Sequence, residues 1–217
     1  AMAASPGSSL ILPDHALPWM AHLKRRGYDF PRGRIDVYRP RQDFQLPADR
    51  GFRAIPTIFA AGDSETAFTA DTVLDWLSVR QNQSWFAHVV FLRPHPPLIA
   101  PEPYNMLYRP ADVPAPRRAA SAAEEGAQHP FLKYKLSRMR AGDGYDEHNP
   151  LDPLSMSDLD LRQMRATYYA LITQVDEQIG RIDSHLKKTG EYDSTLIIFT
   201  CDHGDMLGDH YLDRKST

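Results

Sequence analysis

The sequence predicts an α/β fold with a largely parallel central sheet flanked by helices. Residues 84–92 and 194–200 have the β-branched, aromatic and apolar composition of buried strands. Between them lies a long connection that contains an amphipathic helix. A strand, a helical connection and a second strand are typical of a right-handed parallel crossover. We therefore expect both strands to end at the same edge of the sheet, where α/β proteins place their sites.

The first strand, SWFAHVVFL, is followed by Arg93-Pro94-His95-Pro96-Pro97, so it is expected to end in a rigid loop. A helix is expected before it, over residues 70–80, because Val73, Leu74 and Leu77 recur at helical spacing. This order of elements gives one helix for each of the two expected strands.

The strongest helix prediction covers residues 157 to 188. Its apolar residues recur at steps of three and four, which places them on one stripe: Leu161, Met164, Tyr168, Leu171, Ile172, Val175, Ile179, Ile182 and Leu186. Ser157 and Asp160 resemble a capping box, and Gly190 follows the last basic turn. The sequence therefore marks both ends of this helix.

The other regions are rich in proline or in small residues. Residues 31–58 are expected to form loops and short extended pieces, and residues 111–130 a flexible loop within a long connection. A short helix is expected near residues 131–139. The first two segments could pack against a neighbouring subunit, which leaves a homo-oligomer open.

The composition of the 217 residues is that of an ordinary globular protein, with 42% hydrophobic and 24% charged residues. A net charge of −3 and the lack of a long apolar run give no reason to expect a nucleic acid or a membrane as partner. One cysteine, Cys201, excludes an internal disulfide and suits a reducing, cytoplasmic compartment. A neighbouring carboxylate would raise the pKa of its thiol, so we interpret Cys201 as a packed small residue rather than a nucleophile.

Asp202 and His203 are the first candidate site residues, because they follow the second expected strand directly. A carboxylate and an imidazole suit a divalent ion such as zinc, manganese or iron(II), and Gly204 lets the chain turn closely around it. Two ligands do not complete a site, so further ligands must come from elsewhere. The alternative is that Asp202 caps a following helix and that His203 is an ordinary loop residue.

His95 and Lys215 are the other two candidates. Three prolines around His95 restrict the backbone and therefore the directions open to its imidazole. Taken alone, however, His95 is better explained as a polar residue of a stiff surface loop, and Lys215 as a solvated charge.

The ordered combination of these segments resembles the sulfatase family of the alkaline phosphatase superfamily. The resemblance covers roughly residues 84 to 217 and rests on TLIIFTCDHGDMLGDH with Lys215, on the preceding helix MRATYYALITQVDEQIGRI, and on FLRPHPPLIAPEPYNMLY. The last segment is similar to the phosphonate monoester hydrolase and arylsulfatase-like branch. The resemblance implies an alkaline-phosphatase-like fold in which residues 1–217 form one partial catalytic domain, incomplete at both ends.

Carried over by position, the resemblance implies that Asp202 and His203 hold one divalent ion, with Mn, Zn, Ca and Fe not distinguished. It implies that His95 and Lys215 contact the substrate anion, although Arg214 stands where the family usually has glycine. Three anionic groups fit such a site electrostatically: a phosphonate, a phosphate and a sulfate ester.

The family nucleophile lies in a Cys/Ser-x-Pro-x-Arg string, where the Cys or Ser becomes formylglycine, and this sequence contains no such string. We therefore expect the nucleophile upstream of residue 1 and no turnover by these 217 residues alone. The competing hypothesis is a truncated, non-catalytic paralogue that acts as an anion-binding or protein-interaction module.

Overall fold

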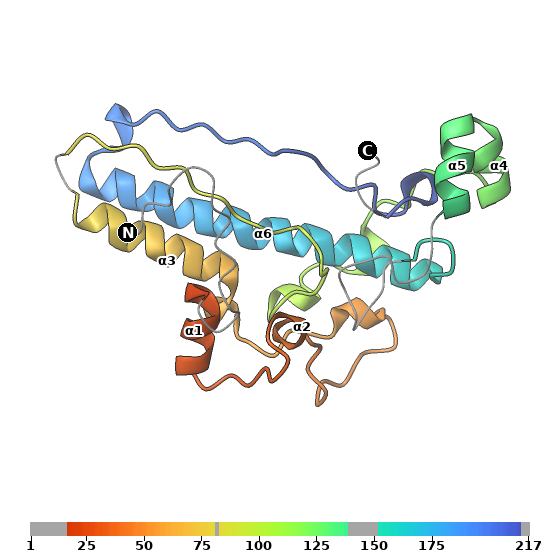
Figure 1. Ribbon diagram of the computed structural model, residues 1–217, viewed down its shortest axis with the longest axis horizontal. Helices are drawn as coiled ribbons and strands as arrows, with labels where there is room; N and C mark the ends of the chain where they lie inside the picture. The colour runs from red at the N-terminus through yellow and green to blue at the C-terminus, as the bar shows by residue number, and fades with distance from the viewer. Residues whose placement is uncertain (1–16, 81–82, 139–151, 214–217) are drawn as a thin grey trace.

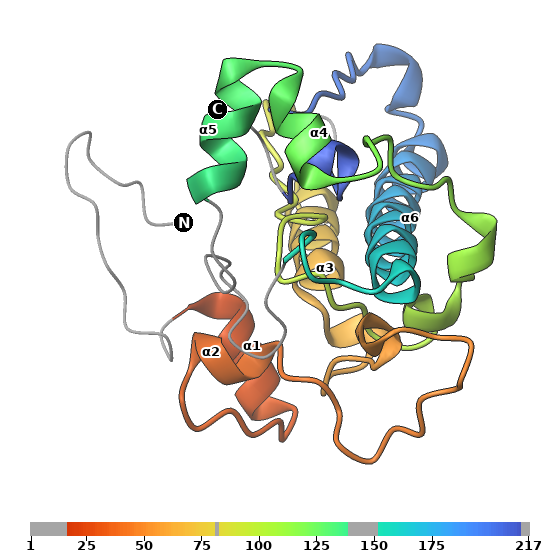
Figure 2. The same ribbon diagram turned by 90° about the vertical axis from the view of Figure 1, so that its right-hand side faces the viewer.

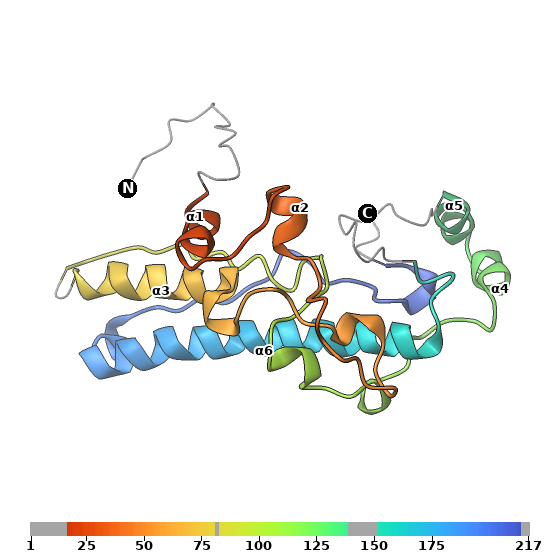
Figure 3. The same ribbon diagram turned by 90° about the horizontal axis from the view of Figure 1, so that it is seen from below.

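Two helices that run side by side form the centre of the molecule. The computed structural model describes residues 17–80, 83–138 and 152–213. Helix α6 (Asp158–Thr189) spans most of the long axis, and α3 (Glu65–Ser78) packs along it in the same direction (Figures 1 and 3). An ion pair of 2.6 Å between Arg181 of α6 and Asp71 of α3 joins their exposed sides.

Both ends of α6 form as the sequence predicts. The Ser157 Oγ accepts a hydrogen bond of 3.1 Å from the N–H of Asp160 and donates one of 2.7 Å to its carboxylate. At the other end, Gly190 adopts a left-handed φ of 75°, which lets the N–H of Glu191 bond to the carbonyl of Leu186 at 3.0 Å. The helix predicted from periodicity and capping residues is therefore confirmed.

The core lies in two clusters, one on α6 and the other near the start of the described chain. The α6 cluster contains Leu98, Ala100, Leu161, Met164, Leu171 and Leu207. The second contains Trp19, Met20, Leu23, Phe30, Val37 and Phe59, which come from α1 (Pro18–Arg25), from α2 (Arg34–Val37) and from the loops that follow them. Figure 3 shows α1 and α2 on one side of the α3–α6 pair. The short helix α2 lies within residues 31–58, where the sequence predicted only loops and extended pieces.

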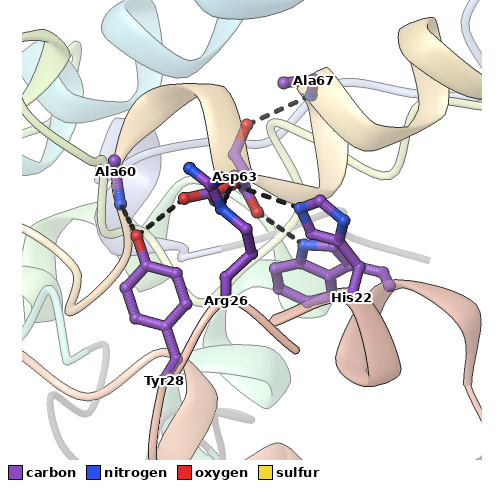
Figure 4. A network of polar contacts seen from close by, with 8 residues as sticks. His22, Arg26, Tyr28, Ala60, Asp63 and Ala67 are labelled. Atoms are coloured by element: carbon purple, nitrogen blue, oxygen red, sulfur yellow. Dashed lines mark hydrogen bonds and ion pairs between the residues drawn. The ribbon is translucent and has the colours of Figure 1, made fainter. Parts of the chain in front are cut away.

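A buried carboxylate fixes α1 to the start of α3 (Figure 4). The Asp63 carboxylate accepts a hydrogen bond of 2.8 Å from the hydroxyl of Tyr28. It also lies 3.2 Å from Nε2 of His22 and 3.1 Å from Nε of Arg26. Burial by itself would raise the pKa of Asp63, but the hydrogen bonds from Tyr28 and His22 and the charge of Arg26 outweigh it and lower that pKa. Asp63 is therefore an ionised anchor between the two helices.

Two further helices pack on each other near the beginning of α6 (Figures 1 and 2): α4 (Ala122–Ala127) and α5 (Pro130–Arg138). Helix α5 matches the short helix expected near residues 131–139. The described chain also contains six 3₁₀ turns: Phe52–Ala54, Ala61–Asp63, Tyr104–Met106, Pro110–Asp112, Tyr192–Ser194 and Asp209–Tyr211. None of the helices in the described ranges combines the length and apolar character that a membrane crossing requires.

The predicted central sheet is wrong for the part of the chain that the structure describes. Residues 84–92 and 195–200 are extended, but neither segment pairs as a strand; the described β-pairing is one isolated bridge between Pro40 and Thr57. Many apolar side chains of both segments are exposed to solvent, with Phe86 87% exposed and Leu196 85% exposed. The described architecture is helical, with two extended segments beside it.

The reason lies in what an apolar pattern can report. It identifies side chains that favour burial, whereas a strand also needs a neighbour that takes up its backbone N–H and C=O groups. The direction of the two segments does agree with the expected crossover. Each follows a helix and returns along the α3–α6 pair in the same sense as the other (Figures 1 and 3).

Candidate metal centre and anion-contact site

Asp202 and His203 form an exposed turn directly after the second extended segment. The Asp202 carboxylate accepts 2.9 Å from the backbone N–H of His203, and its other oxygen lies 3.5 Å from Nε2 of the same histidine. The Asp202 side chain is 88% exposed. Helix capping was the alternative explanation for Asp202, but here the carboxylate turns to its own neighbour and the residues after it, up to Met206, are not helical.

The two side chains are arranged as adjacent metal ligands would be. His203 Nδ1 lies 2.9 Å from the carbonyl of Gly204, which favours the tautomer with the proton on Nδ1 and a free lone pair on Nε2. Two ligands bound to one ion at about 2.0–2.2 Å lie about 3.0–3.5 Å apart, which the separation between Nε2 and the Asp202 oxygen matches. The donor set thus fits a divalent ion. No group of three or more His, Cys, Asp or Glu side chains that could hold a metal ion occurs among the described residues, so the pair does not by itself make a complete metal site.

Tyr168 of α6 lies close to this turn and links it to the core. Its ring packs against the α6 cluster. Burial raises the pKa of Tyr168, and the negative charge of Asp205 raises it further. Cys201, immediately before the turn, is exposed, so the interpretation of Cys201 as a packed residue is wrong.

His95 occupies the loop that the prolines were predicted to stiffen. Its side chain is exposed, and Nδ1 lies 2.7 Å from the carbonyl of Pro96. The adjacent Arg93 is buried, and its Nη1 donates to the carbonyls of His95 and Pro97 at 2.8 and 2.6 Å. The imidazole therefore extends from a loop whose backbone is held by hydrogen bonds from Arg93.

That the four candidate residues, His95, Asp202, His203 and Lys215, form one site stays a prediction. His95 and the pair Asp202 and His203 follow extended segments that run in the same sense, which agrees with their meeting at one end (Figure 1). Lys215, with the neighbouring Arg214, lies outside the described residues.

Sequence reasoning missed the contacts that hold residues 207–211. Arg165 of α6 donates at 3.0 Å to the carbonyl of Leu207 and at 3.0 Å to the Asp209 carboxylate, which also accepts 2.8 Å from the N–H of Arg117. Within this segment Leu207, His210 and Tyr211 all have positive φ values, of 49°, 53° and 60°. Non-glycine residues in this region are strained and persist only where the surroundings hold them.

Glu125 and His210 form a further contact that holds residues 207–211. Glu125 of α4 is buried, accepts 2.6 Å from the N–H of Ala119, and lies 2.7 Å from Nδ1 of His210. These two interactions, the backbone bond first, lower the pKa of Glu125. Because the partners are 85 positions apart in the chain, no local pattern could have indicated the contact.

An acid and an imidazole that could share a divalent ion are what this turn offers, and comparison with known proteins identifies the family of the chain. The chain belongs to the sulfatase family: the family model "Sulfatase" matches residues 15–217. The resemblance seen in the sequence, to the alkaline phosphatase superfamily and to its phosphonate monoester hydrolases, is confirmed. Enzymes of this family carry a metal ion and formylglycine.

Similar proteins and structures come from several bacteria. The chain is 38% identical over 196 residues to the multifunctional alkaline phosphatase superfamily protein PehA of Trinickia caryophylli, covering 89% of this chain and 36% of PehA. The phosphonate monoester hydrolase SpPMH of Silicibacter pomeroyi matches with a TM-score of 0.76 and 42% identity, over 90% of this chain and 37% of that one. The phosphonate monoester hydrolase of Agrobacterium radiobacter matches with a TM-score of 0.81 and 38% identity, over 95% and 40%. The chain thus spans well under half the length of these relatives.

Proposed function

We propose that the protein to which this chain belongs hydrolyses phosphonate monoesters, phosphate monoesters or sulfate esters with the help of one divalent metal ion. Membership of the sulfatase family supports the reaction type. The names of similar proteins, two phosphonate monoester hydrolases and an arylsulfatase of Clostridium perfringens, support this range of substrates. In this proposal Asp202 and His203 supply part of the metal shell.

One observation carries the proposal. The Asp202 oxygen and His203 Nε2 lie 3.5 Å apart, while His203 Nδ1 is engaged by the carbonyl of Gly204. A histidine whose Nδ1–H is held by a carbonyl has its Nε2 lone pair available and oriented, which is how proteins prepare imidazole ligands. Two neighbouring surface residues that bind no ion would need neither this tautomer of the histidine nor side chains that point to the same place.

The remaining candidates act on charge and protons. The metal, when bound, polarises a non-bridging oxygen of the ester as a Lewis acid. His95 has Nδ1 at the Pro96 carbonyl, so its imidazolium form can direct the Nε2 proton to the leaving-group oxygen. Lys215 adds a positive charge that stabilises the anionic group, most strongly in the transition state as the leaving group departs.

Metal content and hydrolysis in the complete protein test the proposal. We expect His203→Ala and Asp202→Asn to lose bound metal by elemental analysis and to lose at least about 100-fold in turnover of p-nitrophenyl phenylphosphonate, phosphate and sulfate. The matched control is His88→Ala, since His88 is exposed in the first extended segment. A His203→Ala protein with full metal content and full turnover would refute the assignment.

The alternative, a non-catalytic module that binds an anion or another protein, makes a different forecast. Residues 1–217 produced alone should show no turnover above their own His203→Ala variant under either hypothesis, because no Cys/Ser-x-Pro-x-Arg string is present. The complete protein discriminates: wild type without metal and without turnover supports the module, whereas metal-dependent turnover supports the hydrolase.

A further inference from the structure

Arg93 is a buried cation without a carboxylate partner in the described part of the chain. The residue is 7% exposed, and its partners among the described residues are two backbone carbonyls and an aromatic ring. Burial of a guanidinium is costly unless its charge and its N–H groups are met by other dipoles. The contacts that meet them therefore indicate what the residue does.

Those contacts come from the loop that carries His95. The Arg93 Nη1 donates to the carbonyl of His95 at 2.8 Å and to the carbonyl of Pro97 at 2.6 Å. One nitrogen thus joins the backbone on both sides of Pro96. Because the His95 Nδ1 is itself 2.7 Å from the Pro96 carbonyl, the position of this backbone also sets the orientation of the imidazole.

The other side of the guanidinium is held by an aromatic ring. Its central carbon lies 4.2 Å from the centroid of Tyr38, whose hydroxyl donates 2.9 Å to the Glu65 carboxylate at the start of α3. Burial and the charge of Glu65 raise the pKa of Tyr38 despite the opposing charge of Arg93, so the hydroxyl stays protonated and keeps donating. The support of the loop therefore runs from α3 through Tyr38 and Arg93 to His95.

We propose that Arg93 is a positioning residue for the anion-contact site: it holds the carbonyls of His95 and Pro97 so that Nε2 of His95 points at the leaving-group oxygen of the ester. This inference rests on the proposed role of His95. Arginine suits the task because a planar guanidinium can stack on a ring while its N–H groups donate in the plane, which the ammonium of lysine cannot do. A shift of about 1 Å in a catalytic group can cost about 100-fold in rate, so the loss of this support should be measurable.

A double-mutant cycle in the complete protein provides the test. The variants are Arg93→Met, Arg93→Lys, His95→Ala and Arg93→Met/His95→Ala, with kcat, KM and the melting temperature measured for each on one p-nitrophenyl ester. We expect Arg93→Met to lower kcat about 10- to 100-fold with a smaller change in KM, and Arg93→Lys to lose less. In the His95→Ala background, Arg93→Met should change kcat by less than about twofold, because there is no imidazole left to position.

The control is Arg39→Met, which removes the guanidinium of the residue next to Tyr38 in the sequence, where it donates to the carbonyl of Asp29. It should leave kcat unchanged. If Arg93→Met does not fold, Arg93→Lys in both backgrounds carries the same comparison.

The possible failures are distinguishable. Equal losses from Arg93→Met with and without His95 would show a purely structural role and overturn the inference, as would an Arg93→Met protein with wild-type kcat while His95→Ala is impaired. If His95→Ala retains full turnover, the substrate contact assigned to His95 is itself wrong, and the inference about Arg93 falls with it.

Discussion

The buried carboxylate of Asp63 gives the sharpest test of how the molecule is held together. Its side chain is 7% exposed, and its two oxygens serve different donors: one faces His22 and Arg26, the other faces Tyr28. Asp63→Asn keeps the shape but replaces one oxygen by an NH₂ group. In either orientation, this NH₂ group meets donors, so at least one of these interactions is lost.

The expected cost follows from these contacts. One hydrogen bond to a charged group contributes about 1.5–3 kcal/mol, and the ion pair with the 61% exposed Arg26 adds at most about 1 kcal/mol. The sum is about 2–4 kcal/mol. For a chain of this size each kcal/mol shifts the melting temperature by about 2–4 °C, so a loss of 3 kcal/mol corresponds to about 6–12 °C.

Thermal unfolding followed by circular dichroism measures the loss, with Asp43→Asn as the control. The Asp43 side chain is 81% exposed and pairs with Arg41 at 3.0 Å, so its substitution should cost less than about 1 kcal/mol. An Asp63→Asn melting temperature within the range of the control would show that the network contributes nothing to stability.

The pH dependence of the same comparison adds a second test. The pKa of Asp63 is lowered in the folded protein, so its stabilisation is complete above the unfolded value of about 4 and is lost as the pH falls through the folded value. The difference in melting temperature between wild type and Asp63→Asn should therefore shrink below about pH 4. A difference that stays constant from pH 7 to pH 3 would contradict the proposed ionisation.

Three further substitutions test other contacts. Ser64→Ala removes the acceptor that caps α3 at the N–H of Ala67, 3.1 Å away, and should cost about 1–2 kcal/mol in urea unfolding. Gly208→Ala places a Cβ 2.6 Å from Cδ1 of Leu161 at a φ of 89°, and should lower the free energy of unfolding by about 2–4 kcal/mol. Glu125→Gln should lower the melting temperature at pH 7, with the gap narrowing below about pH 4, because the pKa of Glu125 is lowered in the fold.

Each of these substitutions has a control of the same type at a position where the contact is missing. Ser78→Ala removes an exposed hydroxyl at the other end of α3, Gly62→Ala adds a Cβ with no atom within 4 Å, and Glu124→Gln changes the exposed neighbour of Glu125. If a control costs as much as its partner, the contact assigned to that partner does not account for the loss.

The sequence predicted α3, α5 and α6 because their signals are local, but it did not predict α1, α2 or α4. The ends of α6 are encoded by Ser157 and Gly190, each of which acts within its own turn. The sheet could not be predicted in this way, since an apolar run such as residues 195–200 says nothing about whether a neighbouring strand is present. In the described chain this run is extended and exposed.

The same distinction between local and long-range signals applies to the candidate site. Asp202 and His203 could be proposed as metal ligands because they are adjacent in the sequence. Arg93 could not be found in this way, since its importance depends on Tyr38, which comes from a separate loop 4.2 Å away in space. The same holds for Arg165, whose contacts with Leu207 and Asp209 join residues more than 40 positions apart.

The length of α6 has a consequence for how members of this family can vary. Its 32 residues form a rod of about 48 Å, and the chain that leaves its far end at Gly190 returns to meet Arg165 near its beginning. One inserted residue between Arg165 and Gly190 would move the return point by about 1.5 Å and rotate it by about 100°. We therefore expect natural insertions and deletions to be absent from this helix and to occur in the Pro-rich segments around it. The helix thus sets a fixed distance between the two ends of the fold.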